Sequence, residues 1–207
     1  MFNTREKKER ALGVKLFLKA SRCASPKCAT VRRPTRPGMH GAARRRAPSE
    51  YGRQLLEKQK FQFAYGLREA QVRSLFKKAL KDPAATGMTF ANLLEARLDN
   101  VLYRLGFTLS RSVARQVVGH GHVFVNGRRV SIPSYSVKVG NVVTIRPQSK
   151  EHPALKDVQE RLKNYEPPTW LKLDKSEAIG TVVAVPRVDE PPFDVGLVVD
   201  YYSKIVK

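Results

Sequence analysis

The residues best suited to binding phosphate groups are concentrated between positions 110 and 129. Arg111 and Arg115 are four residues apart and would share one face of a helix. The basic residues that follow them are His120, His122, Arg128 and Arg129. Guanidinium groups donate several hydrogen bonds in fixed directions, which suits phosphate oxygens. The pattern predicts binding to a polyanion, with a solvated basic surface as the simpler alternative.

Two helices are expected to carry the first of these side chains. Apolar residues recur at helical spacing from Leu94 to Leu105, and Gly106 is suited to end that helix. Ser110 stands where an N-cap residue would begin a second helix over residues 111–118. Arg111 would then lie in the first turn of that second helix.

A small antiparallel sheet is expected to follow these helices. Asn126-Gly127 separates two short β-favouring runs, and such a pair predicts a type I′ hairpin turn because both central residues need positive φ. Two further β-like runs, over residues 135–139 and 142–145, flank Gly140-Asn141. The whole segment therefore predicts two helices followed by a hairpin-containing sheet.

The charge of the chain favours nucleic acid as its partner. The 207 residues carry a formal net charge of +21. Residues 1–50 contribute +11, residues 51–150 contribute +12 and residues 151–207 contribute −2. The sequence contains no apolar run near the ~20 residues that span a bilayer, and its first residues lack the apolar segment of a signal peptide. We therefore expect an intracellular protein with no membrane partner, whose basic body binds nucleic acid.

Residues 1–48 are expected to form a basic, extended N-terminal arm. This segment has too few apolar residues to fold alone. It is either a disordered tail or an arm that becomes ordered against RNA, and its prolines and glycines favour the arm. The candidate RNA contacts here are Arg32, Arg33, Arg36, His40, Arg44, Arg45 and Arg46.

The two cysteines, Cys23 and Cys28, form at most half of a metal site. A structural zinc site needs four ligands, and the sequence near this pair adds only His40. A disulfide is not expected in a reducing compartment. The ligand count thus argues against zinc, and packing and turn formation are the expected roles of the pair. No cofactor is expected.

The remaining segments are mainly helical, with two strands near the end. Ser49 can cap a helix, and Tyr65-Gly66 divides residues 49–82 into two helices. Short strands are expected from Trp170 and from Gly180. Tyr51, Lys58 and Lys60 are candidate RNA contacts, although aromatic residues at helical spacing are more often core residues.

The sequence offers no convincing enzyme active site. It contains no glycine-rich phosphate loop ending in Lys-Ser or Lys-Thr. Glu95 and Asp99 would share a helix face, but we expect them to pair with Arg104 and with the neighbours of Arg97 rather than act as an acid and a base. We therefore expect no enzyme and no small-molecule substrate.

Several motifs resemble a known family. Arg97-Leu-Asp-Asn-Val-Leu-Tyr-Arg-Leu-Gly-Phe, Ser110-Arg-Ser-Val-Ala-Arg-Gln, Gly119-His-Gly-His-Val-Phe-Val-Asn-Gly and Pro133-Ser-Tyr are similar to the S4 RNA-binding domain. The likeness extends from about residue 13 to residue 203 as a resemblance to the bacterial-type ribosomal protein S4 family. Some members hold zinc with four N-terminal cysteines, whereas here Glu9 and Arg10 stand near the place of the first pair.

The resemblance implies an α+β fold with three parts. These are the arm over residues 1–48, a mainly helical subdomain over 49–94 and 151–207, and an inserted S4 domain over 95–150 with two short helices and a small antiparallel sheet. Residues 195–202 are apolar and β-branched, so by themselves they could form a strand, but the resemblance implies that they are helical. In the S4 domain, the candidate RNA contacts are Arg97, Ser110, Arg111, Arg115, Gln116, His120, His122, Asn126, Arg128 and Arg129.

The resemblance further implies a structural protein of the small ribosomal subunit. Its expected partners are small-subunit (16S-type) rRNA in the 5′ domain, neighbouring ribosomal proteins, and mRNA near the path by which it enters the subunit. A role in nucleating assembly on a cytoplasmic or organellar ribosome follows. Two alternatives stay open. One is an RNA-modifying enzyme that carries an S4 module, but it would need an added catalytic domain, and only 57 residues follow Lys150. The other is a translational repressor that binds mRNA.

Overall fold

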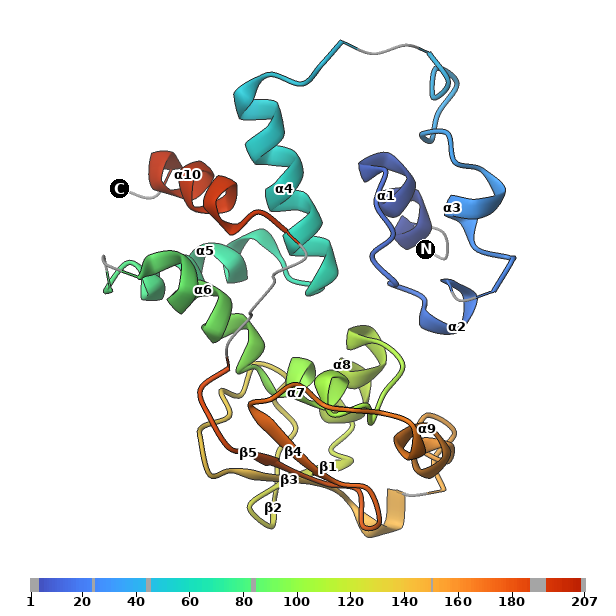
Figure 1. The fold of residues 1–207 in the computed structure, drawn as a ribbon, viewed down its shortest axis with the longest axis vertical. Helices are drawn as coiled ribbons and strands as arrows, with labels where there is room; N and C mark the ends of the chain where they lie inside the picture. The colour runs from blue at the N-terminus through green and yellow to red at the C-terminus, as the bar shows by residue number, and fades with distance from the viewer. Residues whose placement is uncertain are drawn as a thin grey trace. The chain divides into compact units, whose positions relative to one another are not determined.

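The structure is a computed structural model that describes residues 4–23, 25–43, 46–82, 85–149, 151–186 and 193–205. It contains helices and one antiparallel sheet, which confirms the expected α+β class. The chain divides into two compact units, residues 1–87 with 190–207 and residues 88–189 (Figure 1).

The first unit is helical. Its helices are α1 (Thr4–Leu12), α2 (Ala20–Cys23), α3 (Ala29–Arg32), α4 (Glu50–Ala64), α5 (Glu69–Ala79) and α10 (Val195–Ile205). The break between α4 and α5 falls at Tyr65-Gly66 as expected, and Ser49 Oγ accepts a hydrogen bond from Gly52 N at 3.2 Å. The expected C-terminal helix is present as α10, which packs against α4. Its Tyr202 is fully buried and donates to Glu69 at 3.0 Å.

The second unit contains the helices that carry the predicted arginines. They are α6 (Thr86–Glu95), which begins just before the unit boundary, α7 (Leu98–Arg104), α8 (Arg111–Gly119) and α9 (Val158–Lys163), with a 3-10 turn η1 (Pro147–Ser149). The helix expected from Leu94 to Leu105 is therefore two helices. The chain is extended at Arg97, with φ −70° and ψ 138°, so the apolar stripe continues across a break.

A loop takes the place of one expected strand. Residues 135–139 make only an isolated bridge between Ser136 and Arg97. The backbone of this loop instead caps α7, because Leu98 N donates to Tyr135 O at 2.9 Å and Asp99 N donates to Pro133 O at 3.2 Å. The first N–H groups of a helix lack partners within the helix, and Arg97 supplies no side-chain cap. The need to satisfy them explains why this β-like segment does not join the sheet.

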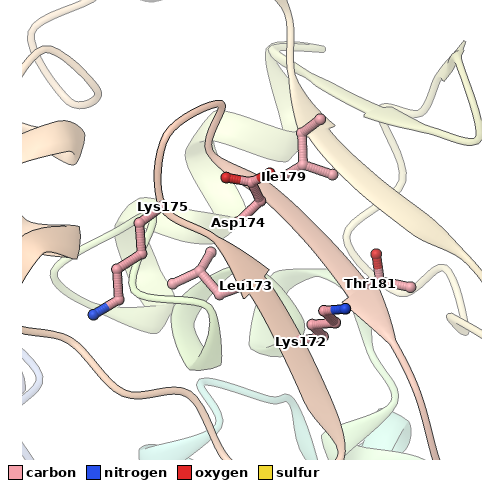
Figure 2. Close-up of a pocket in the computed structure, with 6 residues that line it drawn as sticks. All are labelled: Lys172, Leu173, Asp174, Lys175, Ile179 and Thr181. Carbon is pink, nitrogen blue, oxygen red and sulfur yellow. The ribbon is translucent and has the colours of Figure 1, made fainter.

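The sheet has five strands in the order β2-β1-β3-β5-β4. They are β1 (Val123–Val125), β2 (Arg128–Arg129), β3 (Val142–Ile145), β4 (Leu171–Asp174) and β5 (Ile179–Val182). All neighbouring pairs are antiparallel. The β4–β5 hairpin carries a shallow hollow, shown in Figure 2, lined by Lys172, Leu173, Asp174, Lys175, Ile179 and Thr181.

The sheet corrects the expected domain boundaries. We expected residues 151–207 to join the helical subdomain, but β5 pairs with β3, so residues 151–189 belong to the second unit with residues 88–150. Pairing β5 with β3 covers an edge that would otherwise expose unpaired backbone groups. Trp170, Leu171 and Val182 then complete a core with α7 and α8.

Candidate nucleic-acid interface

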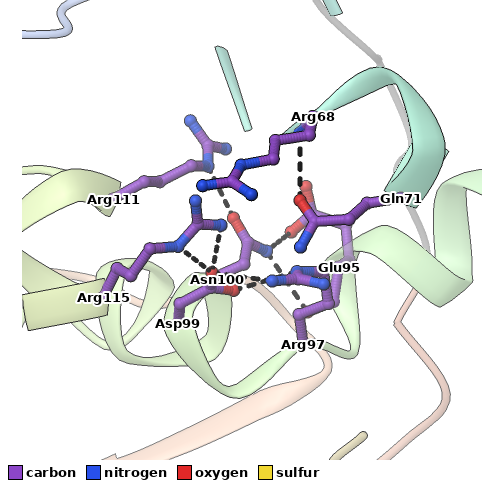
Figure 3. Close-up of polar contacts among 8 residues, drawn as sticks. All are labelled: Arg68, Gln71, Glu95, Arg97, Asp99, Asn100, Arg111 and Arg115. Atoms are coloured by element: carbon purple, nitrogen blue, oxygen red, sulfur yellow. Dashed lines mark hydrogen bonds and ion pairs between the residues drawn. The ribbon is translucent and has the colours of Figure 1, made fainter. Parts of the chain in front are cut away.

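A buried carboxylate fixes one of the two predicted arginines of α8. Asp99 is 3% exposed and lies in the first turn of α7. Arg97 donates to it at 3.1 and 3.0 Å, and Arg115 donates to it at 3.1 and 2.7 Å (Figure 3). The Arg115 side chain remains 35% exposed, while that of Arg97 is 6% exposed. Asp99 therefore balances the buried Arg97 and orients Arg115 at the surface.

A buried amide fixes the other arginine. Asn100 is 1% exposed, and its Oδ1 accepts a hydrogen bond from Arg111 Nε at 2.6 Å. Its Nδ2 donates to Glu95 at 2.5 Å (Figure 3). Glu95 also accepts two hydrogen bonds from Arg104 at 2.9 Å. The Arg111 guanidinium lies 4.6 Å from the centroid of the Tyr103 ring. The pairing of Glu95 with Arg104 is as the sequence predicted, whereas Asp99 pairs with Arg97 itself rather than with its neighbours.

Buried residues of α7 and α8 hold this pair of arginines in place. Four apolar residues at the base of α7 and α8 are at most 1% exposed: Val101, Leu102, Ala114 and Val117. Ser110 Oγ accepts a hydrogen bond from Val113 N at 3.4 Å, so the predicted N-cap is confirmed. Side chains ordered in advance lose little further entropy on binding, so this surface is suited to a fixed array of phosphates. Gln116, on the same helix, is exposed.

The hairpin presents two more arginines at the surface. Asn126 and Gly127 have φ values of 50° and 75°, as the predicted type I′ turn requires. Arg128 and Arg129 form β2 and are exposed. Asn126 Oδ1 accepts a hydrogen bond from Val142 N at 2.8 Å, so this side chain also ties the turn to β3.

His122 is half-buried beside two arginines and two other histidines. Its Nδ1 lies 2.9 Å from Ser149 Oγ, and its ring centroid lies 4.7 Å from that of His152. Burial lowers the pKa of His122, and the nearby His152, His120, Arg146 and Arg129 lower it further. The lowered pKa favours the neutral form of the ring. His120 is exposed at the end of α8.

Three predicted contact residues have packing roles instead. Lys58 is 8% exposed and pairs with Glu69 at 2.6 Å, Arg97 is 5% exposed, and Ser110 is 5% exposed as the N-cap of α8. Burial leaves these side chains little surface for RNA, so we omit them from the interface. Lys60 pairs with Glu57, and Tyr51 is 57% exposed.

The arm has its own local order. Arg10 donates to Thr35 O at 3.0 and 2.9 Å, and buried Glu9 accepts hydrogen bonds from Leu16 N at 3.0 Å and Leu18 N at 3.2 Å. The exposed candidates are Arg32, Arg33, His40 and Arg46, with Arg36 half-exposed. Arg44 and Arg45 lie outside the described residues.

The cysteines are buried, free thiols. Burial raises the pKa of Cys23, whereas a hydrogen bond with Thr30 lowers the pKa of Cys28. Glu9 Oε2 lies 3.9 Å from Cys23 Sγ. Within the described ranges, no three His, Cys, Asp or Glu side chains are grouped so that they could hold a metal ion.

Sequence reasoning missed the groups that anchor Arg111. Asn100 and Tyr103 contact its guanidinium, and neither was a predicted site residue. A polar residue within an apolar helical stripe was the available signal for Asn100. Across the described residues, no helix has both the length and the apolar character needed to cross a membrane.

Comparison with known proteins identifies the family. Residues 2–95 match the ribosomal protein S4/S9 N-terminal domain, and residues 96–143 match the S4 domain. The small ribosomal subunit protein uS4 of Pelotomaculum thermopropionicum is 50% identical over 194 residues, covering 93% of each chain. The uS4 proteins of Gloeobacter violaceus and Thermus thermophilus are 48% and 46% identical over 94% and 93% of each chain. The chain therefore belongs to the small ribosomal subunit protein uS4 family.

Proposed function

We propose that this chain binds 16S-type rRNA directly in its 5′ domain and nucleates assembly of the small ribosomal subunit. The observation that carries this proposal is the anchoring of Arg111 and Arg115 by Asn100 and Asp99. Fixed guanidinium groups select a particular arrangement of phosphates, and such an arrangement exists only in a folded RNA.

The proposed RNA contacts fall into three groups of exposed or half-exposed residues. From α8 and the turn after it come Arg111, Arg115, Gln116, His120 and His122. From the hairpin come Asn126, Arg128 and Arg129. From the arm and from α4 come Arg32, Arg33, Arg36, His40, Arg46, Tyr51 and Lys60. The role is structural, without catalysis or a cofactor, on a ribosome of the cytoplasm, beside other small-subunit proteins and near the path by which mRNA enters.

The test is binding of the purified chain to small-subunit rRNA and to an unrelated RNA of equal length across a salt series. We expect a steep salt dependence for both, because each neutralised phosphate contributes a slope of about 0.7–0.9 in log K against log salt. We also expect a large preference for the rRNA at every salt concentration. Equal affinity for the two RNAs would reject recognition of a folded site.

A translational repressor role is a second proposal, favoured by the same observation. Arginines that recognise backbone geometry accept any RNA that presents the same phosphate arrangement. Binding to the leader of the mRNA that encodes this chain, with competition by rRNA, tests it. A leader that binds no better than unrelated RNA would reject the repressor role and leave the rRNA proposal intact.

A further inference from the structure

The sheet of the second unit has one apolar face and one mixed face. Successive side chains of a strand point to opposite faces. The residues of β1, β3 and β5 that pack toward α7 and α8 are at most 8% exposed: Val123, Val125, Val143, Ile145 and Val182. The alternate residues are half-exposed: Phe124, Val142, Thr144, Ile179 and Thr181. We call this second face the outward sheet face.

The strand register defines which residues share the outward sheet face. Arg129, Phe124, Thr144, Ile179 and Asp174 form one row across all five strands. A second row contains Val142, Thr181 and Lys172. Arg146 N donates to His122 O at 2.9 Å, which continues the β1–β3 ladder and places His122 beside Arg146 in a third row.

Aromatic rings are grouped at one end of this face. His122 and Phe124 are two residues apart on one extended segment, so their Cα atoms are separated by roughly 7 Å. The ring of His152 lies 4.7 Å from that of His122, and the ring of His120 lies 5.9 Å from it. Flat rings at a strand surface are suited to stacking with unpaired bases, which tolerate any sequence because every base has a π face.

Two cations lie near these rings and a third lies farther along the face. Arg129 donates to His120 O at 3.5 Å, and its guanidinium packs over Gly121, where φ is 75° and an added Cβ would lie 2.2 Å from Arg129 Nε. Arg146 pairs with Gln148, an uncharged partner. Lys172 lies across from Thr181 on the neighbouring strand (Figure 2), and the strand register places it at the end of the face away from the rings.

The acidic residue of this face, Asp174, accepts hydrogen bonds within its own turn. Asp174 Oδ1 accepts hydrogen bonds from Ser176 N at 2.9 Å and Ser176 Oγ at 2.6 Å. These bonds hold the β4–β5 turn and lower the pKa of Asp174. The three rows also contain the cations Arg129, Arg146 and Lys172. Because these outnumber the one carboxylate, the outward sheet face carries a net positive charge that is complementary to a phosphate backbone.

We propose that the outward sheet face binds an unpaired RNA strand, with its bases on the rings of His122 and Phe124 and its phosphates on Arg129, Arg146 and Lys172. The choice of RNA as the ligand rests on the proposed function. His122 and Arg129 are also among the contacts proposed for rRNA, whereas Phe124, Arg146 and Lys172 are not. The outward sheet face does not include the Arg111–Arg115 pair, so a variant of that pair tests the two proposals separately. An unpaired strand fits better than a duplex because a duplex conceals its base faces.

The test uses the full chain, labelled with ¹³C and ¹⁵N, and a ten-nucleotide oligouridylate as the probe. Aromatic resonances of His122, His152 and Phe124 are expected to shift on addition of the oligonucleotide. A duplex RNA of ten base pairs is expected to leave them nearly unchanged. Shifts confined to α8 and the hairpin turn would overturn the proposal, and so would equal shifts on adding polyglutamate, which carries charge but no bases.

Charge variants test the phosphate contacts. The variant Arg146→Gln with Lys172→Gln is expected to bind oligouridylate about fivefold more weakly near 0.1 M salt and to have a salt slope lower by about 1.4, at 0.7 per lost contact. The control, Lys138→Gln with Lys163→Gln, removes the same charge from exposed positions outside the three rows. Equal weakening in both variants would overturn the proposal.

A further variant separates this inference from the proposed function. Arg111→Gln with Arg115→Gln should leave the oligouridylate shifts of His122 and Phe124 in place while reducing affinity for folded rRNA. If the oligouridylate shifts disappear in this variant, the outward sheet face is not an independent site and the inference is wrong. If rRNA selectivity is absent in the unmodified chain while the shifts persist, the proposed function fails and the inference stands.

Discussion

The arginines of α8 and those of the arm are the same residue type in different physical states. Arg111 and Arg115 contact buried acceptors on Asn100 and Asp99 and keep part of each side chain at the surface. Arg32 and Arg33 are exposed at the end of the four-residue helix α3. The first pair is ordered by the core beneath it, whereas the second pair has the freedom of a surface side chain.

The difference indicates two ways of using positive charge. An anchored guanidinium has lost its rotamer entropy during folding, so binding gains more of the electrostatic energy. An exposed arginine attracts RNA equally well at long range but loses entropy when it is fixed. The α8 surface is therefore expected to supply selectivity, and the arm is expected to supply general affinity.

The largest effect is expected from removing the buried carboxylate that anchors the α8 surface. Asp99→Ala leaves Arg97 buried and unpaired, which costs about 3–5 kcal/mol of unfolding free energy. The control is Asp157→Ala, an exposed residue that makes no side-chain cap to α9. Urea denaturation of both variants measures the difference. Similar values for the two would show that Asp99 anchors nothing.

The next effect separates the two kinds of arginine directly. Arg111→Gln with Arg115→Gln keeps a hydrogen-bond donor at each site but removes two charges. We expect it to lower rRNA affinity at least about tenfold and the salt slope by about 1.4–1.8, from 0.7–0.9 per contact. Arg32→Gln with Arg33→Gln should lower the slope similarly but preserve the preference for rRNA over unrelated RNA. Equal loss of selectivity in both pairs would contradict the comparison.

A smaller effect concerns the turn that presents Arg128 and Arg129. Gly127→Ala places a Cβ at a φ of 75° with no neighbouring atom within 4 Å, so the expected loss of about 1–2 kcal/mol comes from backbone strain alone. Gly119→Ala, also without an atom within 4 Å but without positive φ, is expected to be neutral or slightly stabilising. Thermal unfolding of the pair measures this difference, and equal melting temperatures would rule out strain.

The smallest effect is a pH dependence from His122. Its folded-state pKa is lowered, first by burial and then by His152, His120, Arg146 and Arg129. As the pH falls below about 6.5, the unfolded chain binds a proton that the folded chain does not, so the unfolding free energy decreases until the folded pKa is reached. His122→Gln should reduce this decrease. Denaturation at pH 7.5 and 5.5 measures it, and an identical pH response in the variant would contradict this assignment.

The sequence alone determined the local structures that depend on neighbouring residues. Ser110 and Ser49 cap their helices, and Asn126-Gly127 forms its turn, because each feature needs only a few adjacent groups. The division of residues 49–82 into two helices and the strands near Trp170 and Gly180 also follow from local pattern. The similarity to the uS4 relatives compared covers 93–94% of the chain.

Tertiary structure decided what depends on distant partners. Residues 151–189 belong to the second unit because β5 pairs with β3. Residues 133–135 accept hydrogen bonds from the first N–H groups of α7, so the segment at 135–139 caps that helix instead of forming the expected strand. Burial likewise removed Lys58, Arg97 and Ser110 from the interface while Asn100 entered it as an anchor. A charge pattern shows that a residue is basic, but only the packing around it determines whether its charge faces a carboxylate inside the protein or a phosphate outside.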